Sequence, residues 1–150
     1  GAQYILFPRG SESDEAFLLG VLSSIILDWY ARRFVEVNFN FFLFNQLPIP
    51  RPDKNNKLRE RIINISARLA SKDERYKSWA NAIGVDCGPL SDEEKIDKIN
   101  ELNALVAHLY NLSKDEVIHI YTTFHDSWNY KADLDAALIH FYSWQKKEDG

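Results

Sequence analysis

Apolar residues recur at helical spacing along most of this 150-residue chain, and this periodicity restricts its fold more than any other feature. The pattern is clearest near the start, where it predicts one helix from about 14 to 34 with Ser13 as its N-terminal cap. The apolar positions of that segment share one broad face: 17, 18, 21, 22, 25, 26, 29 and 30. A helix of this kind must bury that face against other elements.

Two capping boxes indicate where later helices begin. Ser91 with Glu94, and Ser113 with Glu116, each pair a hydroxyl cap with a carboxylate three residues on. The helix after Ser91 is expected to bury Ile96, Ile99, Leu102, Leu105, Val106 and Leu109. The helix after Ser113 is expected to bury Val117, Ile118, Ile120, Tyr121 and Phe124.

Three further helices complete the prediction. One starts near 53 to 56 and buries Leu58, Ile62, Ile65 and Leu69. The next covers 72 to 82, contains Tyr76 and Trp79, and ends at Gly84, which suits the left-handed C-cap position. After a turn, the last runs from about 132 to 146 with Leu134, Leu138, Phe141 and Tyr142 inward. The predicted fold is mainly α, an irregular bundle of about six helices.

Two segments depart from the helical pattern. Residues 4–7 form a short β-prone run before Pro8 and are compatible with a short N-terminal strand. Near 45–52, three prolines bias the residues before them towards extended backbone, so an extended Pro-rich strap is expected there.

Length and composition fit one helical domain over residues 1–150. The chain contains no methionine, and we interpret it as a fragment of a larger protein. The most apolar run, 16–27, is too short to span a bilayer, so no membrane contact is expected. The single cysteine, Cys87, cannot form an internal disulfide, which favours a reducing, cytoplasmic location.

The charge balance divides the chain. A net charge of −4 argues against a free-standing nucleic-acid binder, because basic side chains supply most non-specific affinity for phosphate. Positions 1–75, however, carry 11 basic and 9 acidic side chains, whereas positions 76–150 carry 7 and 13. A local basic run opposes only two acidic residues: Arg51, Lys54, Lys57, Arg59, Arg61 and Arg68. This run is either a solvated helix face, the favoured interpretation, or a DNA footprint.

Signatures of catalysis are missing from the sequence. We find no phosphate loop, no paired CxxC, no HExxH, no GxSxG, and no Asn-Pro-Pro-aromatic or Asp-Pro-Pro-aromatic tetrapeptide. The four histidines lack the spacing of a metal site and are interpreted as core or solvated residues. We therefore expect no catalytic, cofactor-binding or metal-binding residue, and Cys87 is expected to be inert.

Polar residues around 32–46 have two interpretations each. Arg32 and Arg33 either complement the negative end of a helix or reach phosphate and base edges. The amides of Asn38, Asn40, Asn45 and Gln46 suit turns or adenine edges. The phenylalanines at 39, 41, 42 and 44 are core residues or stacking platforms. In each case the structural use is favoured.

Two stretches, in order, carry a resemblance to a known family. They are LLGVLSSIILDWYARRFVEVNFNFFLFNQLPIPRP and NELNALVAHLYNLSKDEVIHIYTTF. They resemble the end of the target-recognition region and the helical tail of type IIG restriction-modification enzymes and related N6-adenine DNA methyltransferases. Ser23, Asn103 and Asn111 stand where that family usually has Asn, Asp and Gly.

The resemblance implies that catalysis and DNA positioning belong to different parts of a larger protein. The parent protein would be an S-adenosylmethionine-dependent adenine methyltransferase, with endonuclease activity in some relatives, and its upstream domain would bind the cofactor. This chain, with residues 1–52 ending the recognition region and 53–150 as the helical C-terminal part, would be non-catalytic and help position double-stranded DNA. The candidate DNA-contacting residues are Arg32, Arg33, Asn38, Asn40, Arg51 and Lys54.

A second hypothesis comes from a different class of protein. The helices would form a structural module that docks on the methyltransferase domain or a partner subunit without touching DNA. The acidic second half of the chain favours this alternative for residues 90–150.

Overall fold

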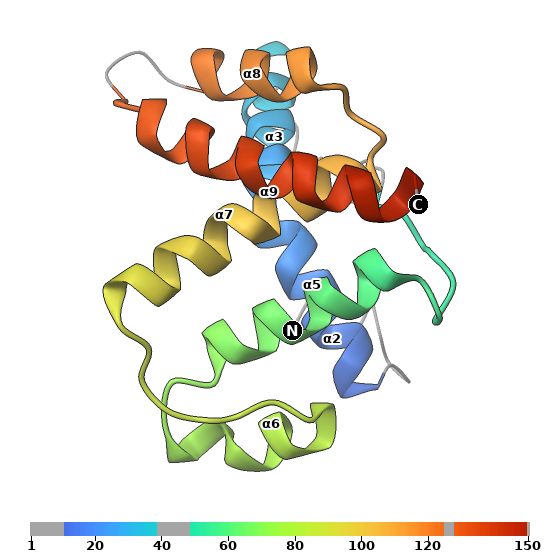
Figure 1. Ribbon diagram of the computed structural model, residues 1–150, viewed down its shortest axis with the longest axis vertical. Helices are drawn as coiled ribbons and strands as arrows, with labels where there is room; N and C mark the ends of the chain where they lie inside the picture. The colour runs from blue at the N-terminus through green and yellow to red at the C-terminus, as the bar shows by residue number, and fades with distance from the viewer. Residues whose placement is uncertain (1–10, 39–48, 125–127, 150) are drawn as a thin grey trace.

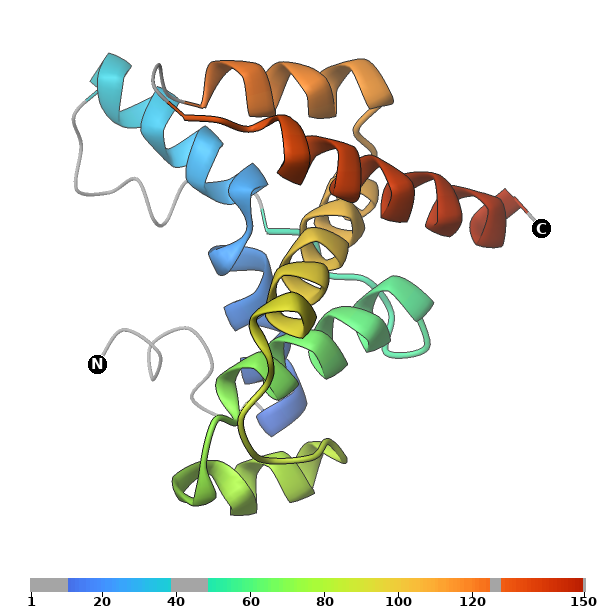
Figure 2. The same cartoon turned by 60° about the vertical axis from the view of Figure 1, so that its left-hand side comes forward.

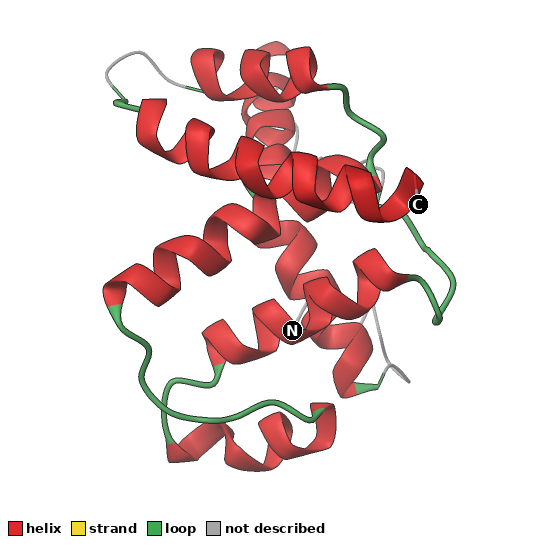
Figure 3. Cartoon of the chain, viewed as in Figure 1, coloured by secondary structure: helices red, strands yellow, loops and turns green. Residues whose placement is uncertain are grey.

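Helices make up all the regular structure in the computed structural model, which describes residues 11–38, 49–124 and 128–149 (Figure 3). Within those ranges there are seven α-helices, labelled as in Figure 1: α2 (Glu12–Ser23), α3 (Ile25–Asn38), α5 (Lys57–Ala70), α6 (Lys77–Ile83), α7 (Asp92–Leu109), α8 (Lys114–Thr123) and α9 (Lys131–Asp149). A 3₁₀ turn, η1 (Glu74–Tyr76), precedes α6. The predicted mainly α fold is confirmed.

The helices form two layers that share α7. Helices α2, α5 and α6 pack together at one end of the molecule, and α3, α8 and α9 gather at the other (Figures 1 and 2). Helix α7 packs against α5 in the first layer and against α3 and α9 in the second. One helix therefore joins both layers in a common core.

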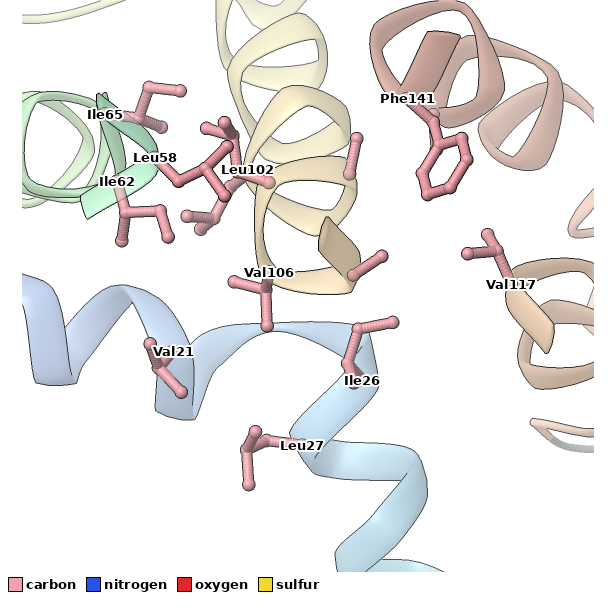
Figure 4. Close-up of a cluster of buried hydrophobic side chains, with 14 of the residues drawn as sticks. Val21, Ile26, Leu27, Leu58, Ile62, Ile65, Leu102, Val106, Val117 and Phe141 are labelled. Carbon is pink, nitrogen blue, oxygen red and sulfur yellow. The ribbon is translucent and has the colours of Figure 1, made fainter. Parts of the chain in front are cut away.

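The core is built where α7 meets its neighbours. Residues 100–107 of α7 are all buried. Figure 4 shows Leu58 and Ile62 of α5 facing Leu102, with Val21 of α2 close by. On the opposite side of α7, Phe141 of α9 and Val117 of α8 complete the cluster. Burying such side chains contributes about 1.5–3 kcal/mol each relative to leaving them exposed.

The predicted single helix from 14 to 34 is wrong, because the chain forms two helices that meet at Ser24. The backbone of Ser24 is extended, with φ −71° and ψ 153°. Its hydroxyl donates to the Val21 carbonyl at 2.7 Å and accepts from the Leu27 amide at 3.3 Å, so it caps both helices. Asn103 Oδ1 accepts from the Ile25 amide at 2.9 Å. These polar contacts replace the helical hydrogen bonds that the break removes.

A close approach between α2 and α5 depends on Gly20. A Cβ atom at this position would lie 2.7 Å from the Ile62 side chain and 3.2 Å from Ser66 Cβ. Ser66 Oγ also donates to the Ala16 carbonyl at 2.5 Å, which ties the two helices together. Only glycine lets the two backbones pack at this distance.

Most predicted helix ends are confirmed. Ser91 and Ser113 form the expected capping boxes, and Gly84 has a left-handed φ of 95°. The first cap was misplaced: Ser11, rather than Ser13, accepts from the Asp14 amide at 3.2 Å. The cap of α5 is Asn56, within the expected start of that helix.

Four residues predicted to lie on buried helix faces are exposed, one of them Tyr30 of α3 at 37%. Ile96 and Ile99 in the first half of α7 are 54% and 46% exposed, and Tyr142 in α9 is 41% exposed. Helices α7 and α9 are long, and the apolar periodicity of a helix does not show which of its turns pack against neighbouring helices.

None of the described helices is both long and apolar enough to cross a lipid bilayer. The expected strand at 4–7 and the first residues of the expected strap, 45–48, lie outside the described residues. The rest of the strap, 49–52, has neither helical nor strand structure.

Candidate nucleic-acid interface

The side chains of three candidate DNA-contacting residues are described, and all three are exposed: Arg32, Arg51 and Lys54. Arg33 and Asn38 belong to α3, but only their backbone is described. Asn40 lies outside the described residues. The structure places Arg32 on α3, whereas Arg51 and Lys54 lie together on the segment that leads into α5.

Arg32 makes two contacts within the chain. Its Nε lies 3.3 Å from Asp28 Oδ1, one helical turn earlier, and its guanidinium carbon lies 4.6 Å from the centroid of the Phe124 ring. The side chain is still 51% exposed. Because α3 continues to Asn38, Arg32 is not in its last turn, and the predicted role at the negative end of the helix is wrong for this residue. Its ring contact instead links α3 to the end of α8.

The segment before α5 has local order. The Asn56 amide donates to the Asp53 carbonyl at 3.0 Å, which closes a turn over Lys54. Asn56 Oδ1 then accepts from the Arg59 amide at 3.0 Å and caps α5. This turn and cap position the cations of the segment at the start of a helix.

Arg51, Lys54 and Lys57 form a small basic group, here called the cation segment. All three are exposed, and none has an ion-pair partner among the described residues. Lys57 is the first residue of α5, where the positive end of the helix dipole disfavours another positive charge. No ion pair among the described residues therefore offsets the charges of this group. Such a group is suited to an external anion.

The other three residues of the basic run serve the fold. Arg59 Nη2 lies 2.6 Å from Asp14 Oδ1, and its guanidinium lies 5.6 Å from the centre of the Phe17 ring. Burial would raise the pKa of Asp14, but hydrogen bonds from Ser11 and the charge of Arg59 lower it overall. This pair connects α5 to the start of α2.

Arg61 and Arg68 also donate hydrogen bonds to other parts of the chain. Arg61 donates twice to the buried carboxylate of Glu101, at 2.8 and 2.9 Å, and Trp144 Nε1 donates to the same group at 3.0 Å. Burial would raise the pKa of Glu101, yet these hydrogen bonds and the Arg61 charge lower it. Arg68 Nη1 donates to the Gly88 carbonyl at 2.8 Å. Of the six residues in the basic run, three contact other groups of the chain and three are exposed without an ion-pair partner among the described residues.

A cleft of about 360 Å³ on a different face was not predicted from the sequence. We call it the α7 cleft, and it is lined by Ser23, Ile25, Asp28, Ile96, Ile99, Asn100, Asn103, Tyr121, Phe124, Trp128 and Asp133. These residues come from α2, α3, α7, α8, α9 and the segment before α9. No single stretch of sequence contains the cleft, so no local signal could have revealed it.

His108, His140 and the cysteine have partners within the described part of the chain. His108 Nε2 lies 2.7 Å from the Phe141 carbonyl, with its ring stacked on Phe141, and His140 Nε2 lies 2.8 Å from Asp97. Cys87 Sγ donates to the Asp73 carbonyl at 2.6 Å. Among the described residues, no cluster of three or more potential metal ligands occurs.

Asn103 and Asn111 occupy special positions. Asn111 has φ 57°, a left-handed conformation that suits glycine best, which is the residue usual in the resembled family. Asn103 holds the joint between α2 and α3, because its Oδ1 accepts from the Ile25 amide.

No family model, curated protein or solved structure matches this chain. The family assignment therefore stays a hypothesis that rests on the two quoted stretches.

Proposed function

We propose that this chain is a non-catalytic, DNA-positioning segment of a cytoplasmic adenine-specific DNA methyltransferase from a restriction-modification or phage-defence system. The resemblance supplies the class of protein and assigns S-adenosylmethionine to the upstream domain of the parent. Flipping an adenine out of a duplex costs a few kcal/mol, so a second part of the protein that grips the DNA supports that step.

The observation that carries this proposal is the cation segment. Arg51, Lys54 and Lys57 are exposed, while Arg59, Arg61 and Arg68 contact other groups of the chain. Phosphate contacts of this kind set the register of a protein on DNA without reading its sequence. Arg32, with half of its side chain exposed, is a further contact on α3.

The test is binding of the full chain to a labelled random-sequence duplex at several salt concentrations. Each phosphate contact contributes about −0.9 to the slope of log K against log salt for duplex DNA. The triple variant Arg51→Ala, Lys54→Ala and Lys57→Ala is expected to weaken binding and to reduce the slope by roughly 2 to 3.

A matched control variant shows whether the loss of DNA binding depends on where the cations lie or only on the net charge. Lys131, Lys146 and Lys147 are exposed on α9, and their replacement by alanine changes the net charge by the same amount. DNA binding by this control variant should match that of the unmodified chain. If both variants bind DNA equally weakly, the loss is due to net charge and not to the cation segment. If the unmodified chain does not bind DNA even at low salt, the proposal is wrong.

A second function, docking on another protein, is favoured by a separate observation. Ile96 and Ile99 expose about half of their surface on α7, beside a cleft that contains carboxylates. Carboxylates repel phosphate, so this face suits a protein partner better than DNA.

A further inference from the structure

Helix α7 leaves two isoleucines open to solvent next to the α7 cleft. Ile96 and Ile99 lie three residues apart, so they share one face of the helix, and they are 54% and 46% exposed. Single exposed apolar residues are ordinary, but two neighbours at the edge of a cleft form a continuous apolar surface. Half-buried Ile25 of α3 extends that surface across the cleft.

Tyr121 lines the cleft with its side chain almost wholly buried, at 1% exposed. Its hydroxyl interacts with the side chain of Asn103, which lines the same cleft. Its ring stacks against Trp128, with the ring centres 5.7 Å apart. Burial raises the pKa of Tyr121, the Asn103 side chain lowers it to a smaller extent, and the charge of Asp133 adds to the increase, so the hydroxyl is neutral.

The charged residues that line the cleft are acidic. Asp28 and Asp133 are the charged residues that line it in the described part of the chain, with no lysine or arginine between them. At one end, Arg32 of the chain itself already contacts Asp28 at 3.3 Å and lies 4.6 Å over the Phe124 ring. Asp133, beside the Tyr121 hydroxyl, has no such cation among the described ion pairs.

We propose that the α7 cleft is a docking site for a helical segment of another protein, which lays leucine-like side chains over Ile96 and Ile99 and extends an arginine or lysine towards Asp133. Apolar side chains of that partner complement the exposed isoleucines, and its positive charge complements Asp133. A helix provides both on one face at the spacing that α7 displays. This proposal does not depend on DNA binding by the cation segment.

Two synthetic helical peptides test the chemistry. One repeats leucine and arginine on one face, and the other has glutamate in place of each arginine. Binding of each labelled peptide to the full chain is followed by fluorescence polarisation. The leucine-arginine peptide should bind at least about tenfold more tightly than its glutamate counterpart, which corresponds to about 1.4 kcal/mol.

Variants then locate the site. Ile96→Ser with Ile99→Ser should weaken binding of the leucine-arginine peptide about tenfold, and Asp133→Asn should weaken it about threefold to tenfold. The matched controls are Ile139→Ser and Asp135→Asn, because Ile139 is 70% exposed and Asp135 is exposed on α9, and neither lines the cleft. Both controls should bind as the unmodified chain does. Circular dichroism verifies that every variant is folded.

Several outcomes overturn the proposal. They are no binding of the leucine-arginine peptide up to about 1 mM, equal binding of the two peptides, or equal losses in the control variants. Loss of duplex DNA binding in the Ile96→Ser, Ile99→Ser variant would assign this face to nucleic acid instead. The triple variant of the cation segment should keep full peptide binding, so failure of the DNA proposal and failure of this one are distinguishable.

Discussion

A single buried carboxylate, Glu101, links three helices. It lies on α7, accepts two hydrogen bonds from Arg61 of α5, and accepts a third from Trp144 of α9. Its side chain is 9% exposed, while that of Arg61 is 39% exposed. Buried charges are tolerated only where pairing and hydrogen bonds compensate for lost water, and here three donors do so.

Glu101→Gln should destabilise the fold by about 1–3 kcal/mol at neutral pH, because the amide accepts fewer hydrogen bonds and leaves Arg61 without its counter-charge. Burial would raise the pKa of Glu101, but the hydrogen bonds from Arg61 and Trp144 and the Arg61 charge hold it below its usual range in the folded state. The carboxylate therefore stabilises the fold above its unfolded-state pKa, and this contribution is lost as the pH falls through the lower folded-state pKa.

The measurement is the free energy of unfolding in urea at a series of pH values from neutral to acid. The difference between the native chain and Glu101→Gln should shrink on acidification. Glu93→Gln, at an exposed position on the same helix, is the control and should change little. A difference that stays constant with pH would contradict the assigned role of the charge.

The joint between α2 and α3 is controlled by a residue far away in the sequence. Asn103→Ala removes the acceptor of the Ile25 amide, which then lies at the start of α3 without a partner. We expect a loss of about 1–2 kcal/mol in the free energy of unfolding, in the range of a lost helix cap. Ser23→Ala, at an exposed neighbouring position, is the control. Equal stability of Asn103→Ala and the native chain would show that the joint does not need this contact.

Helix ends were predictable where their causes are local. The boxes at Ser91 and Ser113 and the stop at Gly84 depend on residues within three or four positions, and all three are confirmed. The break at Ser24 was missed because the apolar period runs through it unchanged. Its stabilising acceptor, Asn103, is separated from Ile25 by 78 positions. A contact of that kind has no signature in a local window of sequence.

The candidate site was predictable only in part, for a related reason. Charge along the sequence located the run from Arg51 to Arg68, but it did not separate exposed cations from paired ones. Arg61 is paired because Glu101 lies opposite on another helix. Likewise, Ile96 was predicted to be buried because periodicity identifies an apolar face without showing which turns of it are covered.

At the scale of the whole molecule, stability should be greatest along α7. Residues 100–107 are buried without interruption, whereas α6 buries only Ala80. Amide hydrogens in such a core exchange only on large-scale opening, while those of a sparsely packed helix exchange by local opening. Hydrogen exchange followed by mass spectrometry should therefore find 100–107 slowest and 77–83 fastest among the described helices. Comparable protection of the two segments would contradict this assignment.

The two candidate surfaces differ in charge. The cation segment leads into α5 and includes its first residue, whereas the α7 cleft combines carboxylates with exposed isoleucines. Binding of DNA to the first surface and of a protein to the second, as proposed above, would leave each surface accessible while the other is occupied.

The position of α7 in both layers limits how the chain is divided or recombined. In the described part of the molecule, either layer taken alone exposes one side of α7. A chimera that takes α2 and α5 from one parent and α3, α8 and α9 from another must therefore carry an α7 that fits both.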